Sequence, residues 1–317
     1  MKKVILILIC LSMLLLTGCP EQNTVASNVN PFLGGTRGLS IQFSEGAPPE
    51  EVFDADSYPF EVEVKLLNIG ETDVPKDKVE LRLSGINPVD FGKQEQDFIK
   101  SGISEDIIAT IIDSEGNTIE PPPVFVSFND LSYIDVLPGN NQFPLRADVC
   151  YWYSTIAFTD GCIRADVLSR DEDAVCQVQE EKTVFNSGAP IHIVEFSEQP
   201  SGSDKIRYIF KIQHKGSGRF YLPDDSTKCP VNLQTSRLKE NRVHFKIESK
   251  VEDLQCSGLK DGTGKEGDVM LINGEATLHC TQQTTSQLDF VDKIKITLTY
   301  YYKENTETFL LVKKTIN

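Results

Sequence analysis

Short runs in which apolar and polar side chains alternate recur along this chain of 317 residues, and they constrain its fold more than any other feature. The clearest run is FEVEVKL, at residues 60–66. Alternation with a period of two places the apolar side chains on one face of a β-strand. Further runs, separated by Pro, Gly, Asn and Asp, are GLSIQF, VELRLSG, VFVSF, LSYIDVL and LRADVCYWY. Short alternating strands between turn residues predict an all-β protein of the sandwich or barrel type.

A second series of alternating runs begins after residues 180–190, whose sequence is EEKTVFNSGAP. It includes IHIVEF, KIRYIFKIQHKG, RVHFKIE and KIKITLTYYY. Each series has the length of an ordinary domain. We therefore predict two tandem β-sandwich domains, at residues 37–182 and 188–317.

The two predicted domains also repeat each other in sequence. LRADVCYWYSTIAFTDGCI, at 145–163, aligns without a gap with IKITLTYYYKENTETFLLV, at 294–312. The aromatic triplet 151–153 thereby matches the triplet 300–302, while Cys150 matches Thr299. Alternation turns Tyr151 and Tyr153 to one face of the strand and Trp152 to the other. We therefore interpret the triplet as part of a packed strand, with no single ligand platform formed by its three rings.

The N-terminus has the pattern of an export signal. Lys2 and Lys3 precede a run of 13 mostly apolar residues, which is short for a membrane-spanning helix. The Leu-Thr-Gly-Cys sequence that ends at Cys19 resembles the lipobox of bacterial and archaeal lipoproteins. This resemblance implies a signal peptide at 1–18, a lipidated Cys19 and a tether at 19–36. An ordinary cleaved signal is the alternative.

The strand pattern also resembles the immunoglobulin-like, CARDB-type sandwiches of archaeal and bacterial cell-surface proteins. The resemblance depends on the Asn68-Ile69-Gly70 turn after a long alternating strand and on LPGN at 137–140. His214-Lys215-Gly216 occupies the equivalent turn in the second domain. It implies a cell-surface protein with an adhesive, scaffold or spacer role, and it brings no catalytic residues.

One segment of the first domain departs from the alternating pattern. Residues 97–112, DFIKSGISEDIIATII, have isoleucines at helical spacing, although Gly102 and the many β-branched residues disfavour a helix. The segment lies in a longer insertion at 91–123, which we expect to be the part most suited to meet a partner. The simpler alternative is that the insertion covers a sheet edge.

Six cysteines remain after Cys10 and Cys19 are set aside. An even number in an exported chain predicts disulfides, between Cys150, Cys162, Cys176, Cys229, Cys256 and Cys280. We expect Cys256 to pair with Cys280, because they flank neighbouring strands. A hairpin turning near Ile156 would pair Cys150 with Cys162 and leave Cys176 for Cys229. The competing pattern is Cys162 with Cys176 and Cys150 with Cys229. Either pattern links the two domains.

Charge excludes one class of partner and suggests one type of ligand. Loss of Lys2 and Lys3 with the signal reduces 31 basic side chains to 29 against 47 acidic ones, for a net charge of −18. Such a chain does not suit nucleic acid, which needs clustered cations. Acidic loops supply oxygen ligands of the type that Ca²⁺ prefers, including Asp171, Asp173, Asp224 and Asp225. None has EF-hand spacing, so a solvated turn is the simpler interpretation, and no other cofactor is expected.

The sequence contains no recognisable catalytic motif. The patterns G-x-S-x-G, H-E-x-x-H and the P-loop are absent, and the four histidines lack the spacing of metal ligands. A zinc site at Cys256, His279 and Cys280 is the weaker alternative to a disulfide. We therefore expect a non-enzymatic protein that is anchored by lipid on the extracellular side of the membrane and binds another surface protein or envelope component. The alternatives are a solute-binding lipoprotein that serves a transporter and a surface hydrolase.

Overall fold

The structure, a computed structural model, describes residues 30–171, 173–223, 229, 237–250, 253–284 and 286–315. The predicted signal peptide, Cys19, Asp224 and Asp225 lie outside the described residues. Residues 32–317 form one compact unit, and the boundaries at 182 and 188 stay a prediction.

The first half of the described chain contains nine strands and three short 3-10 helices. The strands are β1 (Leu39–Phe43), β2 (Glu51–Phe53), β3 (Phe60–Asn68), β4 (Val79–Ser84), β5 (Ile99–Ser101), β6 (Ile111–Ile112), β7 (Thr118–Ile119), β8 (Val124–Leu131) and β9 (Asn141–Ile163). The helices are η1 (Lys76–Lys78), η2 (Pro88–Phe91) and η3 (Glu95–Phe98).

The second half of the described chain contains nine further strands. They are β10 (Val184–Asn186), β11 (Ile191–Pro200), β12 (Lys205–His214), β13 (Arg219–Tyr221), β14 (Arg242–Glu248), β15 (Leu254–Ser257), β16 (Glu266–Met270), β17 (Glu275–Gln283) and β18 (Phe290–Lys313). The predicted all-β sandwich class is confirmed.

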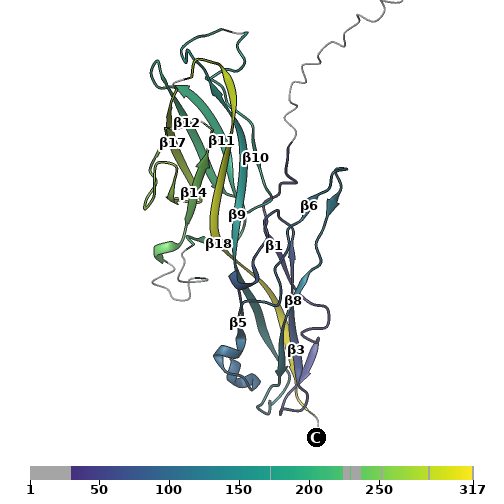
Figure 1. The fold of residues 1–317 in the computed structure, drawn as a ribbon. Coiled ribbons are helices and arrows are strands. Elements are labelled where there is room, and N and C mark those ends of the chain that lie inside the picture. Colours follow the sequence, from purple (N-terminus) through teal and green to yellow (C-terminus); the bar gives the residue numbers. More distant parts are fainter. Residues whose placement is uncertain are drawn as a thin grey trace, which may run out of the picture. The chain divides into compact units, whose positions relative to one another are not determined.

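The described strands form four sheets, and the largest has nine strands. Its central order is β16-β14-β18-β9-β4-β5, with β2, β10 and β13 at its sides. The second sheet has the order β1-β3-β8, the third β11-β12-β17-β15, and the fourth is the hairpin β6-β7. Strands β9 and β18 run antiparallel along almost their full lengths, from Asn141 opposite Val312 to Ile163 opposite Phe290 (Figure 1).

The sequence repeat corresponds to a repeat of strand pairing in the structure. The Arg146–Tyr151 part of β9 pairs with β4, and the equivalent part of β18 pairs with β14. Strands β1, β3, β5 and β8 likewise have the same pairing as β11, β12, β16 and β17. The two aromatic triplets lie opposite each other, with Trp152 across from Tyr301 at their centre. The two copies of the repeat therefore share one sheet.

The turns that contain Gly70 and Gly216 have equivalent hydrogen bonds in the two copies of the repeat. The N–H groups of Ile69 and Gly70 donate to the carbonyl oxygen of Gly38, and those of Lys215 and Gly216 donate to that of Pro190. A Cβ atom on Gly70 would overlap the hydroxyl of Tyr153, and one on Gly216 would overlap that of Tyr302. Only glycine permits this close approach.

The hydrophobic core is continuous through both copies. Alternate residues of β9 and β18 enter it, and Tyr151, Tyr153, Tyr300 and Tyr302 are fully buried. Trp152 faces the opposite side and packs in a small separate cluster. The prediction that the three rings of the 151–153 triplet divide between two faces is confirmed.

The helix considered for residues 97–112 is wrong. Only η3 reaches into this range; β5 and β6 follow it, and β5 pairs with β4. The isoleucine spacing suits a helix, but the backbone groups of this segment bond to neighbouring strands and turns. Tertiary hydrogen bonding therefore overrides a local pattern that β-branched residues and Gly102 already weaken.

Candidate partner-binding site

The predicted insertion contains a hairpin that leaves the main sheets, here called the arm and defined as residues 107–120. Its base is fixed by the hydrogen bonds of one turn. The buried side chain of Asn68 donates to the carbonyl oxygens of Thr72 (2.8 Å) and Ile107 (3.2 Å). Its own oxygen accepts from the Gly70 N–H at 3.1 Å. The turn after β3 thus holds the first residue of the arm.

Further hydrogen bonds fasten the next residues of the arm to the same turn. The Thr110 hydroxyl donates to the Asn68 carbonyl oxygen at 2.8 Å, and the Ala109 N–H donates to the Asp73 carboxylate at 2.7 Å. Ile107 and Thr110 are buried. The base is therefore rigidly attached, while the part beyond Thr110 is paired only with itself.

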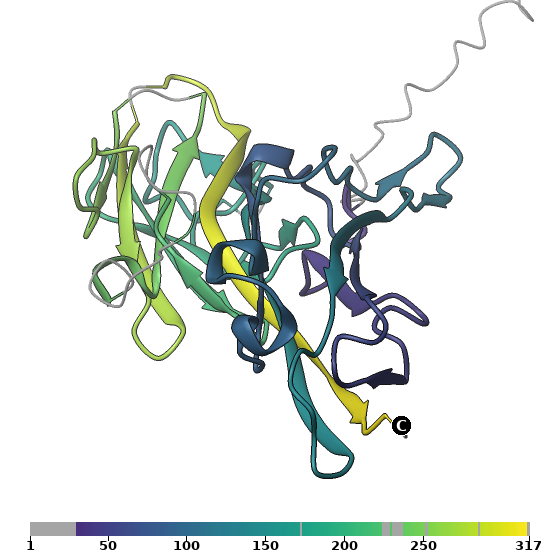
Figure 2. The same ribbon diagram turned by 90° about the horizontal axis from the view of Figure 1, so that it is seen from below.

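The tip of the arm is closed by a side-chain-stabilised turn. Asp113 accepts hydrogen bonds from the N–H groups of Glu115 and Asn117 and from the Asn117 side chain. The hydrogen bond from the Asn117 side chain is the main cause that lowers the pKa of Asp113 below its ordinary value. Gly116 has a φ of +87°, which glycine adopts without strain. Figure 2 shows this hairpin extending away from the other sheets.

The arm exposes apolar side chains that do not stabilise an isolated hairpin. Ile111 of β6 lies directly opposite Ile119 of β7, and their exposed fractions are 53% and 47%. Ile108 is 50% exposed, and Ile112 is also exposed. Full burial of one such side chain is worth about 1.5–3 kcal/mol relative to full exposure. A two-stranded hairpin is only marginally stable in water, so these side chains do little for the arm itself.

The arm itself carries charge of a single sign. Residues 107–120 contain no Lys or Arg. They contain three acids, Asp113, Glu115 and Glu120. The arm therefore presents an apolar centre with an acidic border, which is complementary to an apolar patch bordered by Lys or Arg.

The structure corrects one predicted disulfide pattern. Cys150 pairs with Cys229 and Cys162 with Cys176, so the preferred Cys150–Cys162 bond is wrong and the competing pattern is present. No hairpin turns at Ile156, because β9 continues through it as one strand. Twelve residues of extended strand separate Cys150 from Cys162 by about 40 Å, far beyond the reach of a disulfide.

The local pair predicted between Cys256 and Cys280 is confirmed. These residues lie directly opposite each other on β15 and β17. Their sulfur atoms are therefore not available as thiolates, and the alternative zinc site with His279 is wrong.

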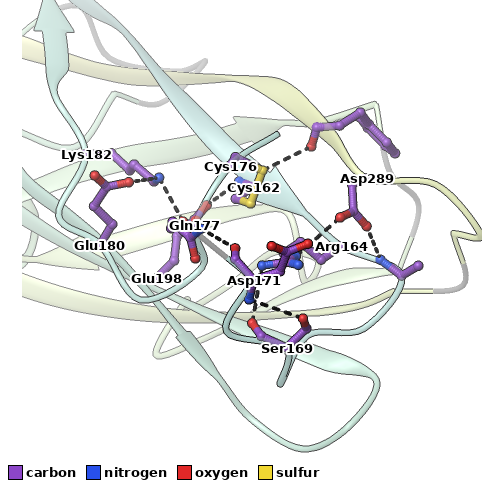
Figure 3. Close-up of a disulfide and its surroundings, with 12 residues drawn as sticks. Cys162, Arg164, Ser169, Asp171, Cys176, Gln177, Glu180, Lys182, Glu198 and Asp289 are labelled. Atoms are coloured by element: carbon purple, nitrogen blue, oxygen red, sulfur yellow. Dashed lines mark hydrogen bonds and ion pairs between the residues drawn. A yellow bond between two sulfur atoms is a disulfide. The ribbon is translucent and has the colours of Figure 1, made fainter. Parts of the chain in front are cut away.

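The surroundings of the Cys162–Cys176 disulfide form a polar cluster beside β11 (Figure 3). Glu198 accepts a hydrogen bond from the Cys162 N–H at 2.8 Å, although only 1% of this residue is exposed. Burial raises the pKa of Glu198 to about 8, despite the opposing Cys162 hydrogen bond and Lys182. Lys182 is paired with Glu180 at 2.6 Å. This carboxyl group is thus largely protonated at neutral pH.

The acidic residues considered for calcium do not form a site in the described residues. The Asp171 carboxylate accepts from the N–H of Asp173 at 3.1 Å, which is a local turn contact. Across the described ranges, no three His, Cys, Asp or Glu side chains form a group that could hold a metal ion. Calcium binding by the acidic loops stays a prediction, which thermal melting with and without a chelator would test.

Three of the four histidines have structural partners for their side chains. His192 bonds to the Gly35 carbonyl oxygen, His214 to the Tyr302 hydroxyl and His244 to Asp268. Burial lowers the pKa values of His192 and His214. These contacts join separate segments of the fold.

The sequence reasoning found the insertion but missed its form. It also missed that Tyr221 and Tyr301 join Trp152 on the outer face of the large sheet. Alternation along β18 places Tyr300 and Tyr302 in the core, so it could have predicted that Tyr301 faces the other side of the sheet. Tyr221 lies outside that long strand, so only the pairing of β13 with β18 reveals its position.

Comparison with known proteins identifies no family. No family model and no curated protein matches this chain. Among solved structures, it is similar to the envelope protein VP37 of White Spot Syndrome Virus, with 10% sequence identity and a TM-score of 0.26. That similarity covers 47% of this chain and 97% of VP37 and is too weak to indicate a shared fold. No helix in the described residues is long and apolar enough to cross a membrane.

Proposed function

We propose that this protein is a non-catalytic, extracellular protein, anchored by a lipid on Cys19, that binds another surface protein through the arm. The observation that carries the proposal is the pair of exposed isoleucines, Ile111 and Ile119, on an arm whose charged side chains are all acidic. A partner with an apolar patch and basic residues around it would cover both features.

Two further observations support an extracellular location. The described chain contains three disulfides, and disulfides persist in oxidising compartments. The lipobox-like Leu-Thr-Gly-Cys sequence supplies the anchor. A lipid with two chains is sufficient for stable anchoring.

A second copy of this chain suits the arm less well than a basic partner. The whole chain has a net charge of −16, so two copies repel each other at a distance.

The fixed base of the arm also favours binding of a partner, because a rigid site loses less conformational entropy on association.

The arm can be tested by zero-length carbodiimide coupling on intact cells that produce the protein. This reagent joins the carboxylates of the arm to amines that touch them. We expect one defined cross-linked species with the full chain and its loss in the Ile111→Ser/Ile119→Ser variant. The control is Ile272→Ser, because Ile272 is 69% exposed but lies outside the arm.

A second variant tests the acidic side chains of the arm. Glu115→Lys/Glu120→Lys is expected to abolish the same species, and added salt is expected to reduce it. Persistence of the species in both arm variants would exclude the arm as the binding site.

The anchor is tested separately. Cys19→Ser is expected to move the protein from the membrane fraction to the medium. Retention of this variant in the membrane fraction would contradict lipidation at Cys19.

A further inference from the structure

The outer face of the nine-stranded sheet carries a cluster of aromatic side chains. The core takes Tyr151 and Tyr153 from β9 and Tyr300 and Tyr302 from β18, so the intervening residues face outward. Tyr221 of β13 lies opposite Tyr301 of β18, which lies opposite Trp152 of β9. Three aromatic side chains from three strands therefore form one row across this face.

The row is held together by a disulfide. Tyr221, Tyr301 and the Cys150–Cys229 pair form a buried cluster, and Trp152 packs against it while remaining partly exposed. The cluster is separate from the main core. Its position is therefore not explained by the packing between the sheets.

A groove of about 480 Å³ adjoins the aromatic row. Its outward-facing lining comes from β9, β13 and β18 and comprises Arg146, Asp148, Arg219, Tyr221, Lys303 and Asn305. This volume is within the range of small-molecule sites. Glu304 also borders the groove, but its carboxylate accepts a hydrogen bond from Tyr151, a core residue.

One cation of the groove is held in a fixed orientation. The Arg146 Nε atom donates to the Asp148 carboxylate at 3.1 Å and to the Ser84 hydroxyl at 3.2 Å. Ser84 also donates to the Asp148 carboxylate at 2.8 Å. Asp148 is buried and holds the Nε atom of Arg146, whose partly exposed side chain lines the groove. A guanidinium fixed in this way suits a planar carboxylate.

The remaining charges favour a ligand with one or a few negative groups. Lys303 Nζ is 3.9 Å from Asp148. Besides the contact of Arg146 with Asp148, Arg146 and Arg219 have long ion pairs at the surface, with Glu307 (4.0 Å) and Glu240 (3.8 Å). Exposed pairs of that length are weak and easily exchanged. Three cations beside Asn305 and Tyr221 are too few and too localised for nucleic acid, which requires an extended basic surface.

We propose that this groove binds a carboxylate-bearing sugar. The carboxylate would pair with Arg146, Arg219 and Lys303, and the hydroxyl groups would bond to Asn305 and Asp148. The planar guanidinium groups and the amide of Asn305, next to the Asp148 carboxylate, supply the hydrogen-bonding groups that the carboxylate and hydroxyls of such a sugar require.

The test is a titration of the full-length protein with trigalacturonate, followed by calorimetry and by tryptophan fluorescence. Trp152 is the only tryptophan of the chain, so its emission reports on this face alone. We expect a Kd below about 1 mM and at least tenfold weaker binding of uncharged galactotriose. Arg219→Gln and Lys303→Gln are each expected to weaken trigalacturonate binding about tenfold.

The matched control is Lys293→Gln, because Lys293 is also on β18 but pairs with Asp160 at 2.7 Å outside the groove. The proposal is overturned if 10 mM trigalacturonate produces neither heat nor a fluorescence change, or if the two groove variants bind like the control. Equal affinity for inorganic phosphate would overturn the assignment to a sugar. The arm variants leave this groove intact, so the two proposals can fail independently.

Discussion

Replacement of Glu198 by glutamine is expected to stabilise the protein at alkaline pH and to have little effect in acid. Glu198 is 1% exposed, one carboxyl oxygen accepts from the Cys162 N–H, and the other has no hydrogen-bond partner. Glutamine retains an oxygen that can accept from Cys162 and introduces no charge. The substitution therefore imitates the protonated carboxyl group.

The magnitude follows from the two pKa values of Glu198. The folded value is about 8 and the ordinary value is 4.5. Between these values the folded chain keeps a proton that the unfolded chain loses, so the free energy of unfolding falls as pH rises. Each unit of difference is worth about 1.4 kcal/mol, which gives about 5 kcal/mol in total. This contribution is fully present below pH 4.5 and is lost as the pH rises through about 8.

The measurement is urea unfolding at several pH values between 4.5 and 9, with tryptophan fluorescence as the signal. The difference in unfolding free energy between Glu198→Gln and the unmodified protein should rise with pH, while ionisation of other groups cancels between the two. Glu195→Gln is the control, because Glu195 is also on β11 but is exposed and paired with Lys211. A difference that is the same at pH 4.5 and pH 9 would refute the assignment of a buried, protonated Glu198.

Three further outcomes are expected. Joint replacement of Cys162 and Cys176 by alanine should cost about 3 kcal/mol, because their bond closes a loop with a separation of 14 residues; an unchanged urea midpoint would contradict this. Tyr153→Phe should cost about 1–2 kcal/mol through loss of the buried hydrogen bond to the Gly188 carbonyl oxygen, which a melting temperature equal to that of the unmodified protein would disprove. The isolated fragment 188–317 should lack cooperative thermal unfolding by circular dichroism, because its longest strand has lost its partner; a sharp transition would show an independent domain.

Much of the secondary structure could be predicted because it depends on local chemistry. The alternation in FEVEVKL became β3, whose residues are alternately buried and more exposed. The same rule placed Tyr151 and Tyr153 in the core and Trp152 on the other face. The Cys256–Cys280 bond was also accessible, because the two cysteines are only 24 residues apart in the chain.

The candidate sites were less accessible to sequence reasoning. The isoleucine spacing in 97–112 agreed with a helix. The exposed arm forms instead because the Asn68 turn holds Ile107 and Thr110 by hydrogen bonds. The groove combines Arg146, Arg219 and Lys303, which are far apart in the chain and meet only through strand pairing.

The sequence by itself determined which residues form strands, which face each side chain occupies and that one strand unit occurs twice. Period-two alternation suffices for these features, since each depends on residues close together in the chain. Only the tertiary structure decided that β9 and β18 pair as continuous strands. The register of this pairing in turn determined the disulfide partners and the groove. Such pairing depends on contacts between residues about 150 positions apart, and an alternating pattern fits many partners equally well.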